Sequence, residues 1–247
     1  MQSDYKTRLF VDVSLDTDVV ISLDRDQSHY LANVMRLKAG DRIAIFNGRD
    51  GEWLSEVSDI TKREVTLRTK THIKKQQAEP DLWLVFAPIK KARLDFIAQK
   101  ATELGVSHMT PVMTRRTIVE RVKTERMAAN AIEAAEQCER LNVPTVGDAV
   151  KLDKLLSEWP ADRKIMFCDE DLSGTPAQTA LAAADEKPAA APWAILIGPE
   201  GGFDDTERAL IRNHSNCVTV SLGPRILRAD TAAMAAISLW QSALGDW

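Results

Sequence analysis

The first 70 residues alternate between apolar and polar positions with a short period. Four segments have the pattern of β-strands, namely residues 9–13, 42–46, 52–60 and 64–69. Asn47-Gly48 and Asp50-Gly51 lie between the second and third segments and are residue pairs that hairpin turns prefer. This part of the chain is therefore predicted to form a small β-barrel or sandwich.

One helix is expected among these strands. Within residues 26–37, four apolar residues recur at helical spacing: Tyr30, Leu31, Val34 and Leu37. Asp26 is suited to cap the start of this helix, and Gly40 follows as a stop. The helix is predicted to close or flank the barrel.

Residues 70–81 contain few apolar side chains and include a proline, which makes them the best linker segment in the chain. The predicted domains are residues 1–72 and residues 73–247. Beyond the linker, apolar strand segments alternate with longer helical patterns. The expected strands are 81–89, 107–112, 164–168, 193–198 and 217–222, and the expected helices are 91–104, 124–141, one after Phe203 and one from about Asp230. Strands separated by helices imply a mainly parallel α/β sheet. Residues 177–192 are biased toward Ala and Pro and are expected to add a surface helix and a loop.

Composition agrees with an ordinary folded protein. The chain has 247 residues, 45% hydrophobic and 28% charged, which allows one large domain or two modest ones. It has no apolar run of 18 residues, and residues 1–10 lack the apolar segment of a signal peptide, so we expect a cytoplasmic protein without a membrane partner. Cys138, Cys168 and Cys217 lie far apart without neighbouring ligands, so we expect small buried side chains and no metal site.

The charge is unevenly distributed. The net charge of −4 argues mildly against a nucleic-acid partner, because nucleic-acid-binding domains are usually strongly basic. Residues 88–126, however, hold nine Lys and Arg against four acidic residues, a local excess of +5. Two readings remain open, a solvated helix face or a surface that contacts phosphate.

The sharpest motif is Gly198-Pro199-Glu200-Gly201-Gly202, which directly follows the apolar strand segment 193–197. Asp204 and Glu207 come next, with the spacing that caps a helix start. Glycines allow a backbone to approach a ligand closely, and ligands of α/β sheets bind beyond the carboxyl ends of the strands. The loop lacks the patterns that bind ATP, GTP or a dinucleotide.

The second motif, residues 221–231 with the sequence SLGPRILRADT, also leaves a strand and enters a helix. Leu222, Ile226 and Leu227 could line a pocket while Arg225 and Arg228 face an anion. Alternatively, the two arginines are surface charges. Asp230 has two possible roles, as the N-cap of the last helix or as a catalytic carboxylate.

These two motifs resemble the signature loops of the SPOUT-class methyltransferases, specifically the bacterial 16S ribosomal RNA uridine N3-methyltransferases of the RsmE type. Residues 99–112 and 133–144 fit the same family, and residues 29–41 are similar to a passage of its PUA-like domain. The resemblance covers nearly the whole chain, in the family's order. One departure is Asp230, where the family usually has Glu.

The resemblance implies an α/β SPOUT domain with a trefoil knot, a PUA-like β-barrel that binds RNA, and a homodimer that uses S-adenosylmethionine to methylate N3 of a uridine in 16S ribosomal RNA, within the small ribosomal subunit. The residues it implies for the cofactor are Phe167, Leu196, Ile197, Gly198, Pro199, Glu200, Gly201, Gly202, Ser221, Leu222, Gly223 and Leu227. The expected catalytic residues are Arg228, Arg225 and Asp230, with the arginines stabilising charge on the uracil. The expected RNA contacts are Arg8, Arg36, Lys90, Lys91, Arg93, Arg116 and Arg140.

Two other functions are compatible with the same residues. The chain could be a ribosome-assembly factor that keeps the RNA-binding domain and an idle knot, in which case it would not bind S-adenosylmethionine. It could also be a methyltransferase for transfer RNA or for another ribosomal site.

Overall fold

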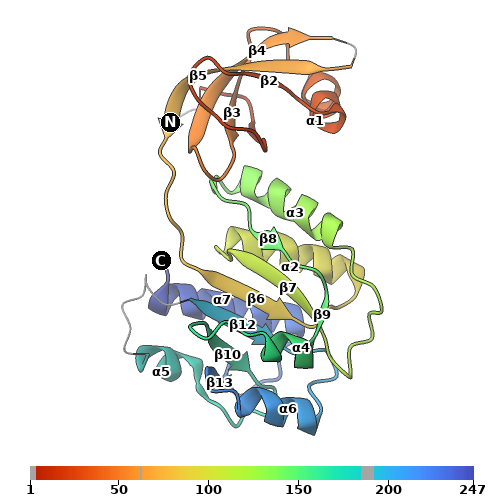
Figure 1. Ribbon diagram of the computed structural model, residues 1–247, viewed down its shortest axis with the longest axis vertical. Coiled ribbons are helices and arrows are strands. Elements are labelled where there is room, and N and C mark those ends of the chain that lie inside the picture. Colours follow the sequence, from red (N-terminus) through yellow and green to blue (C-terminus); the bar gives the residue numbers. More distant parts are fainter. Residues whose placement is uncertain (1–3, 62, 185–191) are drawn as a thin grey trace. The chain divides into compact units, whose positions relative to one another are not determined.

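The computed structural model describes residues 4–61, 63–184 and 192–247. The chain forms two compact units (Figure 1). The first unit comprises Met1–Ala78 together with Ala135–Val143, and the second comprises Glu79–Ala134 together with Pro144–Trp247. The first unit thus continues past residue 72 and recruits a short segment from the middle of the chain.

The first unit is built on a five-stranded sheet with the order β1-β3-β4-β5-β2. Its strands are β1 (Arg8–Phe10), β2 (Val20–Ser22), β3 (Arg42–Phe46), β4 (Glu52–Ile60) and β5 (Val65–Lys74). Only β1 and β3 pair in parallel among the strand pairs described for this sheet. The sheet runs from β1 at one edge to β2 at the other, so it is a half-barrel and not a fully closed one.

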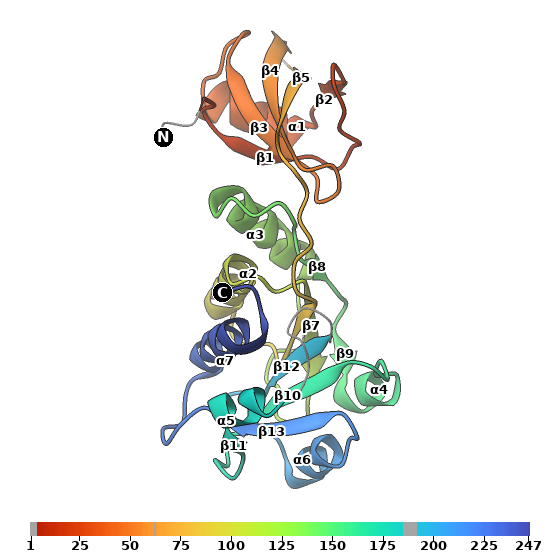
Figure 2. The ribbon, with the colours of Figure 1, turned by 90° about the vertical axis from the view of Figure 1, so that its left-hand side faces the viewer.

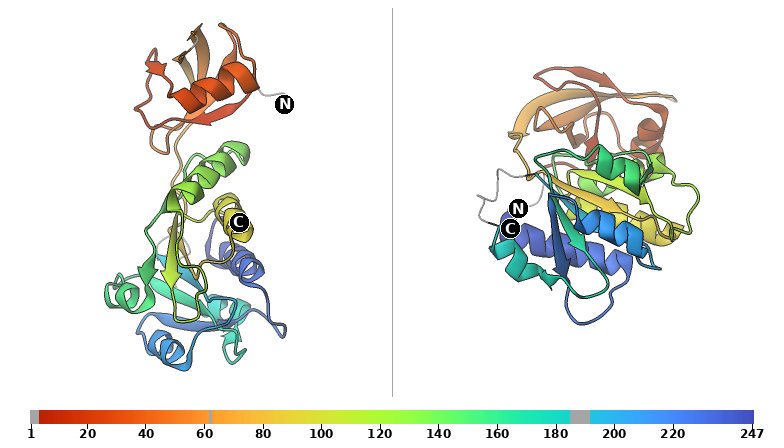
Figure 3. Two further views of the ribbon diagram at one scale, coloured as in Figure 1. Left: turned by 90° about the vertical axis from the view of Figure 1, so that its right-hand side faces the viewer. Right: turned by 60° about the horizontal axis from the view of Figure 1, so that its bottom comes forward.

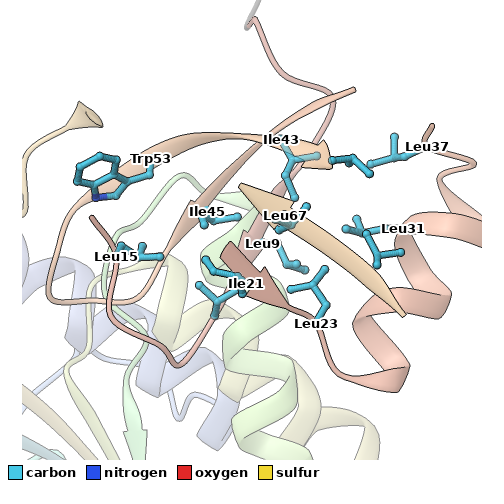
Figure 4. Packing of buried hydrophobic residues seen from close by; sticks show 13 residues of the cluster. Leu9, Leu15, Ile21, Leu23, Leu31, Leu37, Ile43, Ile45, Trp53 and Leu67 are labelled. Atoms are coloured by element: carbon cyan, nitrogen blue, oxygen red, sulfur yellow. The ribbon is translucent and has the colours of Figure 1, made fainter. Parts of the chain in front are cut away.

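Alternate residues of these strands point to one side and form the apolar core of the unit (Figure 4). Ile43, Ile45 and Leu67 are fully buried there, and Leu31 packs on them from the helical segment. Figure 4 shows Trp53 at the far end of the same cluster, and its indole nitrogen donates to the carbonyl of Asp50 at 2.9 Å. The predicted alternation of the first 70 residues therefore corresponds to a real buried face.

The helix of the first unit differs from its prediction. Helix α1 (Arg25–His29) is capped by Asp24, whose side chain accepts from the Gln27 amide, so the expected cap at Asp26 is wrong. A π-helical segment, η1 (Tyr30–Val34), follows, with the Met35 amide donating to the Tyr30 carbonyl. Because a π-turn is wider than an α-turn, residues at α-helical spacing no longer share a face. Leu31 and Leu37 are buried as expected, whereas Tyr30 and Val34 are exposed.

The predicted linker is also shorter than expected. Strand β5 continues through Lys74, which pairs with Glu52 of β4, so the residues from 70 to 74 belong to the sheet. Their polar side chains lie on an exposed part of the strand, which is why apolar content gave no sign of it. Residues 75–81 connect β5 to β6, the first strand of the second unit.

The second unit contains a parallel sheet with the order β11-β13-β10-β12-β6-β7-β8, and β9 pairs with β7. Its strands are β6 (Leu82–Phe86), β7 (His108–Met113), β8 (Thr145–Val146), β9 (Val150–Lys151), β10 (Lys164–Cys168), β11 (Thr175–Pro176), β12 (Trp193–Ile197) and β13 (Cys217–Ser221). The prediction of a mainly parallel α/β sheet is confirmed. The short strands β8, β9 and β11 have no counterpart in the sequence prediction, because two residues are too few for a periodic pattern.

Helices cover both faces of this sheet (Figures 2 and 3). The helices are α2 (Lys91–Glu103), α3 (Thr124–Gln137), α4 (Leu152–Ser157), α5 (Ala177–Ala182), α6 (Asp205–Arg212) and α7 (Ala229–Leu244). Helices α2 and α7 pack together on one face, and α4 and α6 lie on the other (Figure 2). Helix α3 ends at Gln137, four residues before the predicted end at Leu141.

Helix α5 confirms the surface helix expected near residue 177, and the rest of that segment includes residues 185–191, which lie outside the described residues. Cys168 is buried as expected, but Cys138 and Cys217 are only half-buried. Across the three described stretches, we find no helix that is long and apolar enough to cross a membrane.

Candidate active site

Three neighbouring strands bring the two glycine-containing loops together. Strand β10 lies between β12 and β13, with Cys168 in register with Ile197 on one side and with Val220 on the other. Because the strands are parallel, the loops that follow β12 and β13 leave the same edge of the sheet. The loop 198–202 and the loop 222–228 therefore start at the same edge of the sheet, with only β10 between their strands. About twenty residues of sequence separate the two loops.

A cavity of about 400 Å³ lies at this edge, a size within the range of about 300–1,000 Å³ of small-molecule sites. It is lined by Arg93, Cys168, Glu170, Ile197, Gly198, Pro199, Glu200, Gly202, Ile226, Leu227, Arg228, Ala229 and Ala232. Both loops thus contribute to one wall. Two wider depressions, one in each unit, are lined by neither loop and by none of the expected site residues.

Packing requires two of the three glycines in the first loop. A Cβ atom on Gly198 would come within 2.6 Å of the Phe203 ring, and one on Gly202 would collide with the Glu170 carboxylate. Gly202 also has a φ of +69°, a backbone conformation that residues other than glycine rarely adopt. A Cβ atom on Gly201, in contrast, would make only ordinary contacts with Arg116, at 3.7 Å.

Side chains from other elements fix this loop. Arg93 of α2 pairs with Glu200 at 2.6 Å, and Arg116 donates to the carbonyl of Gly201 at 3.0 Å. The loop then enters α6 through a complete capping box between Asp204 and Glu207, as the spacing predicted. Hydrogen bonds from the Thr206 hydroxyl and the Glu207 amide, followed by the Arg115 guanidinium, hold the pKa of Asp204 well below its usual range.

The second loop is more open. Arg228 is exposed and lines the cavity, and Ile226 beside it is 78% exposed. Arg225 is also exposed but is not among the described residues of the cavity wall. The half-buried turn of Ser221, Leu222 and Gly223 also lies off this wall, where the Gly223 amide donates to the Ser221 hydroxyl at 3.3 Å.

Two expected cofactor residues have their side chains in the core. Phe167 and Leu196 are almost completely buried, and the Phe167 ring packs on Phe203 with ring centres 5.3 Å apart. Only their backbones could therefore reach a ligand. Cys168, at the end of the same strand as Phe167, lines the cavity, as does Glu170, which sequence analysis missed. Burial raises the pKa of the Cys168 thiol, so this side chain stays protonated and is no nucleophile.

Asp230 is not the N-cap of the last helix. Helix α7 begins at Ala229, its N-cap residue is Arg228, and Asp230 lies within the first turn, so the capping alternative is wrong. A carboxylate there is still favourable, because the first turn exposes the positive end of the helix dipole. Its side chain lies 3.7 Å from the Arg93 guanidinium, which links it to the wall of the cavity.

Two expected RNA contacts are buried within the first unit. Arg8 pairs with Glu52 at 2.5 Å and donates to the carbonyls of Ala135, Glu136 and Arg140. Four of the five N–H groups of a guanidinium are thereby used, and the side chain is shielded from solvent. Arg140 is only 9% exposed. The prediction that these two side chains contact phosphate is therefore wrong, and Arg8 instead holds the segment Ala135–Val143 to the half-barrel.

The remaining expected RNA contacts have different surroundings. Arg36 is exposed and has a φ of +54°, and Lys90 is exposed just before α2. Lys91 begins α2, but its side chain lies outside the described residues. Arg93 and Arg116 contact the first loop, at Glu200 and at the Gly201 carbonyl. The local charge excess of residues 88–126 is also partly neutralised by acidic residues outside this segment, since Arg115 pairs with Asp204 and Arg93 pairs with Glu200.

The described parts of the chain contain no group of three His, Cys, Asp or Glu side chains that could hold a metal ion. The polar groups of the cavity are instead two guanidiniums, from Arg93 and Arg228, and two carboxylates, from Glu170 and Glu200. This arrangement can bind a small polar ligand and stabilise negative charge that develops beside it.

Comparison with known proteins identifies the family. Residues 76–241 match the model of the RNA methyltransferase domain, and residues 23–70 match that of the RNA methyltransferase PUA domain. A Rickettsia conorii protein named ribosomal RNA small subunit methyltransferase E is 33% identical, over 94% of this chain and 93% of its own. A Bacillus subtilis protein of the same name is 29% identical over 94% of each chain.

A solved structure is similar over its whole length. It is a Legionella pneumophila protein described as a methyltransferase in complex with the bound cofactor S-adenosylmethionine, 29% identical, with a TM-score of 0.87 over 98% of this chain and 99% of that one. The chain therefore belongs to the family of RNA methyltransferases that join a PUA domain to an RNA methyltransferase domain.

Proposed function

We propose that this protein transfers a methyl group from S-adenosylmethionine to N3 of a uridine in 16S ribosomal RNA. The observation that carries the proposal is the single cavity in which both signature loops meet, with Arg228 in its wall. The names of the Rickettsia and Bacillus relatives support ribosomal RNA of the small subunit as the substrate. Proteins of this name are similar along nearly the whole chain, which disfavours the transfer RNA alternative.

The residues of the cavity suit S-adenosylmethionine. Gly198 and Gly202 let the loop backbone pack closely against Phe203 and Glu170, and Ile197, Ile226 and Leu227 supply apolar surface to the cavity. The bound cofactor of the Legionella structure supports the same ligand. We assign its binding to the backbone of residues 196–202 and to the turn at residues 221–223 with Leu227. When bound, the cofactor supplies an electrophilic methyl group.

The chain has to prepare the uracil for this reaction. The N3 position carries a proton and lies on the Watson–Crick edge, so the base must be unpaired or extruded before it reacts. Loss of the proton leaves negative charge shared by N3, O2 and O4. Arg228 stabilises this charge from the wall of the cavity, and Arg225 assists from the exposed loop. Asp230 is the candidate proton acceptor, held near the cavity by Arg93.

We propose that residues 1–72 form an RNA-binding domain and that residues 73–247 carry the methyltransferase site. The match to the PUA-domain model supports the first assignment. Arg36, Lys90, Lys91 and Arg116 remain the proposed contacts to phosphate, and they would set the register of the RNA without reading its sequence.

A homodimer, a trefoil knot in the second unit and a cytoplasmic location complete the proposal. They follow from the family resemblance. Support for a dimer comes from α7, where the apolar side chains of Met234, Ala235 and Leu239 are only half-buried. A second copy of the chain could cover this face.

Nucleoside mass spectrometry tests the function directly. Unmodified small ribosomal subunits and naked 16S RNA are each incubated with the purified protein and S-adenosylmethionine. We expect 3-methyluridine in the subunit sample. If neither sample is modified while the cofactor binds, another RNA is the substrate; if the cofactor does not bind either, the assembly-factor alternative is favoured.

A further inference from the structure

Glu170 lies in neither signature loop, yet it forms part of the cavity wall. It is the second residue after β10, and it lines the cavity together with Cys168, Gly198 and Gly202. Its side chain is 32% exposed, so the carboxylate is neither a free surface charge nor a core residue. Its contacts show what it does there.

One carboxylate oxygen of Glu170 holds the end of the first loop. Oε1 accepts a hydrogen bond from the Phe203 amide at 3.2 Å and another from Nη2 of Arg208 at 2.5 Å. Phe203 directly follows Gly202, and Arg208 lies on α6, the helix that the loop enters. Arg208 is itself held by Asp169, whose side chain is fully buried, at 3.1 Å. The carboxylate therefore connects the end of β10 to both sides of the turn into α6.

The backbone of Gly202 is shaped around the same carboxylate. A Cβ atom on Gly202 would collide with Oε1 of Glu170, and Gly202 also has a positive φ, which residues with a side chain rarely adopt. The glycine and the glutamate thus depend on each other: the loop can pass this close to the carboxylate only because position 202 has no side chain.

We infer that Glu170 is a positioning residue that holds the loop 198–202 in the shape that binds S-adenosylmethionine. This inference rests on the proposed function. A loop that is already fixed loses little conformational entropy when it binds its ligand, so affinity depends on the contacts that fix it. Hydrogen bonds to a carboxylate are stronger than those between neutral groups, which suits Glu170 to this role.

The test compares cofactor binding by Glu170→Ala and Glu170→Gln with that of wild type and Asp171→Asn. Asp171 is a matched control, because it is the next carboxylate in the chain and pairs with Arg212 and Ser173 without lining the cavity. By calorimetry, we expect E170A to weaken S-adenosylmethionine binding by about 10-fold or more, the size expected for a hydrogen bond to a charged group. E170Q keeps the oxygen but loses the charge, so its affinity should be intermediate, and D171N should equal wild type.

Two readouts separate positioning from general stability. The KM for S-adenosylmethionine should rise in E170Q while kcat at saturating cofactor changes by less than about 3-fold, because binding energy alone is affected. The melting temperature of E170Q should stay close to that of wild type. Wild-type affinity in a folded E170Q and E170A would overturn the inference, as would equal losses in D171N.

A double-mutant cycle tests the contact itself. Gly202→Ala should weaken cofactor binding in wild type through both the collision with Glu170 and the unfavourable φ. In the E170A background the collision is absent, so the same substitution should cost clearly less, and the two effects should not add. Additive effects would show that the two residues act independently and would overturn the inference. Failure of the wild-type protein to bind the cofactor would instead overturn the proposed function.

Discussion

The two loops of the cavity follow the strands on either side of β10, but they differ in how firmly the rest of the protein fixes them. The loop 198–202 is tied by Arg93, Arg116 and Glu170 and ends in a capping box. The loop 222–228 has contacts within its own turn, and it exposes Arg225, Arg228 and 78% of Ile226. The first loop is therefore held in shape without a ligand, whereas the second leaves Arg225, Arg228 and Ile226 exposed to solvent.

This difference suggests a division of labour. A fixed backbone suits a ligand that is the same in every turnover, such as a cofactor. Exposed arginines suit a substrate that arrives from solvent and whose charge must be stabilised only during the reaction.

Arg228→Ala is expected to have the largest effect. If the second loop acts on the substrate, kcat should fall by about 100- to 1,000-fold while the affinity for S-adenosylmethionine stays within about 3-fold of wild type. Single-turnover methylation and calorimetry measure the two quantities. An unchanged kcat would remove Arg228 from catalysis, and an equal loss of cofactor affinity would show that the two loops share one task.

Gly198→Ala should break the first loop, because its Cβ atom would press on the Phe203 ring at 2.6 Å. Overpacking of this kind costs about 1–3 kcal/mol of folding free energy. The free loop can relieve this strain by moving away from the ring, and because binding requires its original shape, cofactor affinity should fall by roughly 5- to 150-fold. Gly201→Ala is the control in the same loop, since its new Cβ atom finds only ordinary contacts. If both variants bind the cofactor alike, the loop is not fixed in the way described.

Ile226→Ser should have a smaller effect, of about 5-fold, on cofactor affinity. The side chain borders the cavity and is mostly exposed in the free protein, so its burial contributes only when a ligand is present. The melting temperature of the free protein should not change. Leu210 is the control, because its apolar side chain is also exposed but lies outside this cavity. Leu210→Ser should leave cofactor binding intact. A lower melting temperature for I226S would show that the second loop is also preformed.

The smallest expected effect is that of pH on the stability that Asp204 contributes as the N-cap of α6, the helix that the first loop enters. The folded pKa of Asp204 lies below its ordinary value of 3.8, so the cap stabilises the folded state fully above that value and loses its effect as the pH falls below it. The stability difference between wild type and Asp204→Ala should be constant from pH 7 to pH 5 and shrink below about pH 4. Chemical denaturation over this range measures it. A difference that changes near neutral pH would point to another group.

Local patterns predicted local structure well. The alternation of residues 42–46 and the apolar run of residues 193–197 correspond to β3 and β12, and Asp204 with Glu207 forms the expected capping box. The errors occur where a neighbour far away in the chain decides the outcome. Arg8 has the sequence surroundings of a surface cation, yet carbonyls of residues 135–140 bury it. Likewise, the acidic residues after β10 gave no sign of which one faces the cavity.

The sequence by itself determined the two classes of sheet, the loops rich in glycine and arginine, and the family resemblance, because strand periodicity, turn residues and motif spacing are all local properties. The tertiary structure decided that β10 separates β12 from β13, which brings both loops to one cavity. It also decided that Glu170 holds one of them and that Arg8 is buried. These outcomes depend on which strands pair and which side chains are thereby enclosed, and such pairings join residues that no local pattern connects.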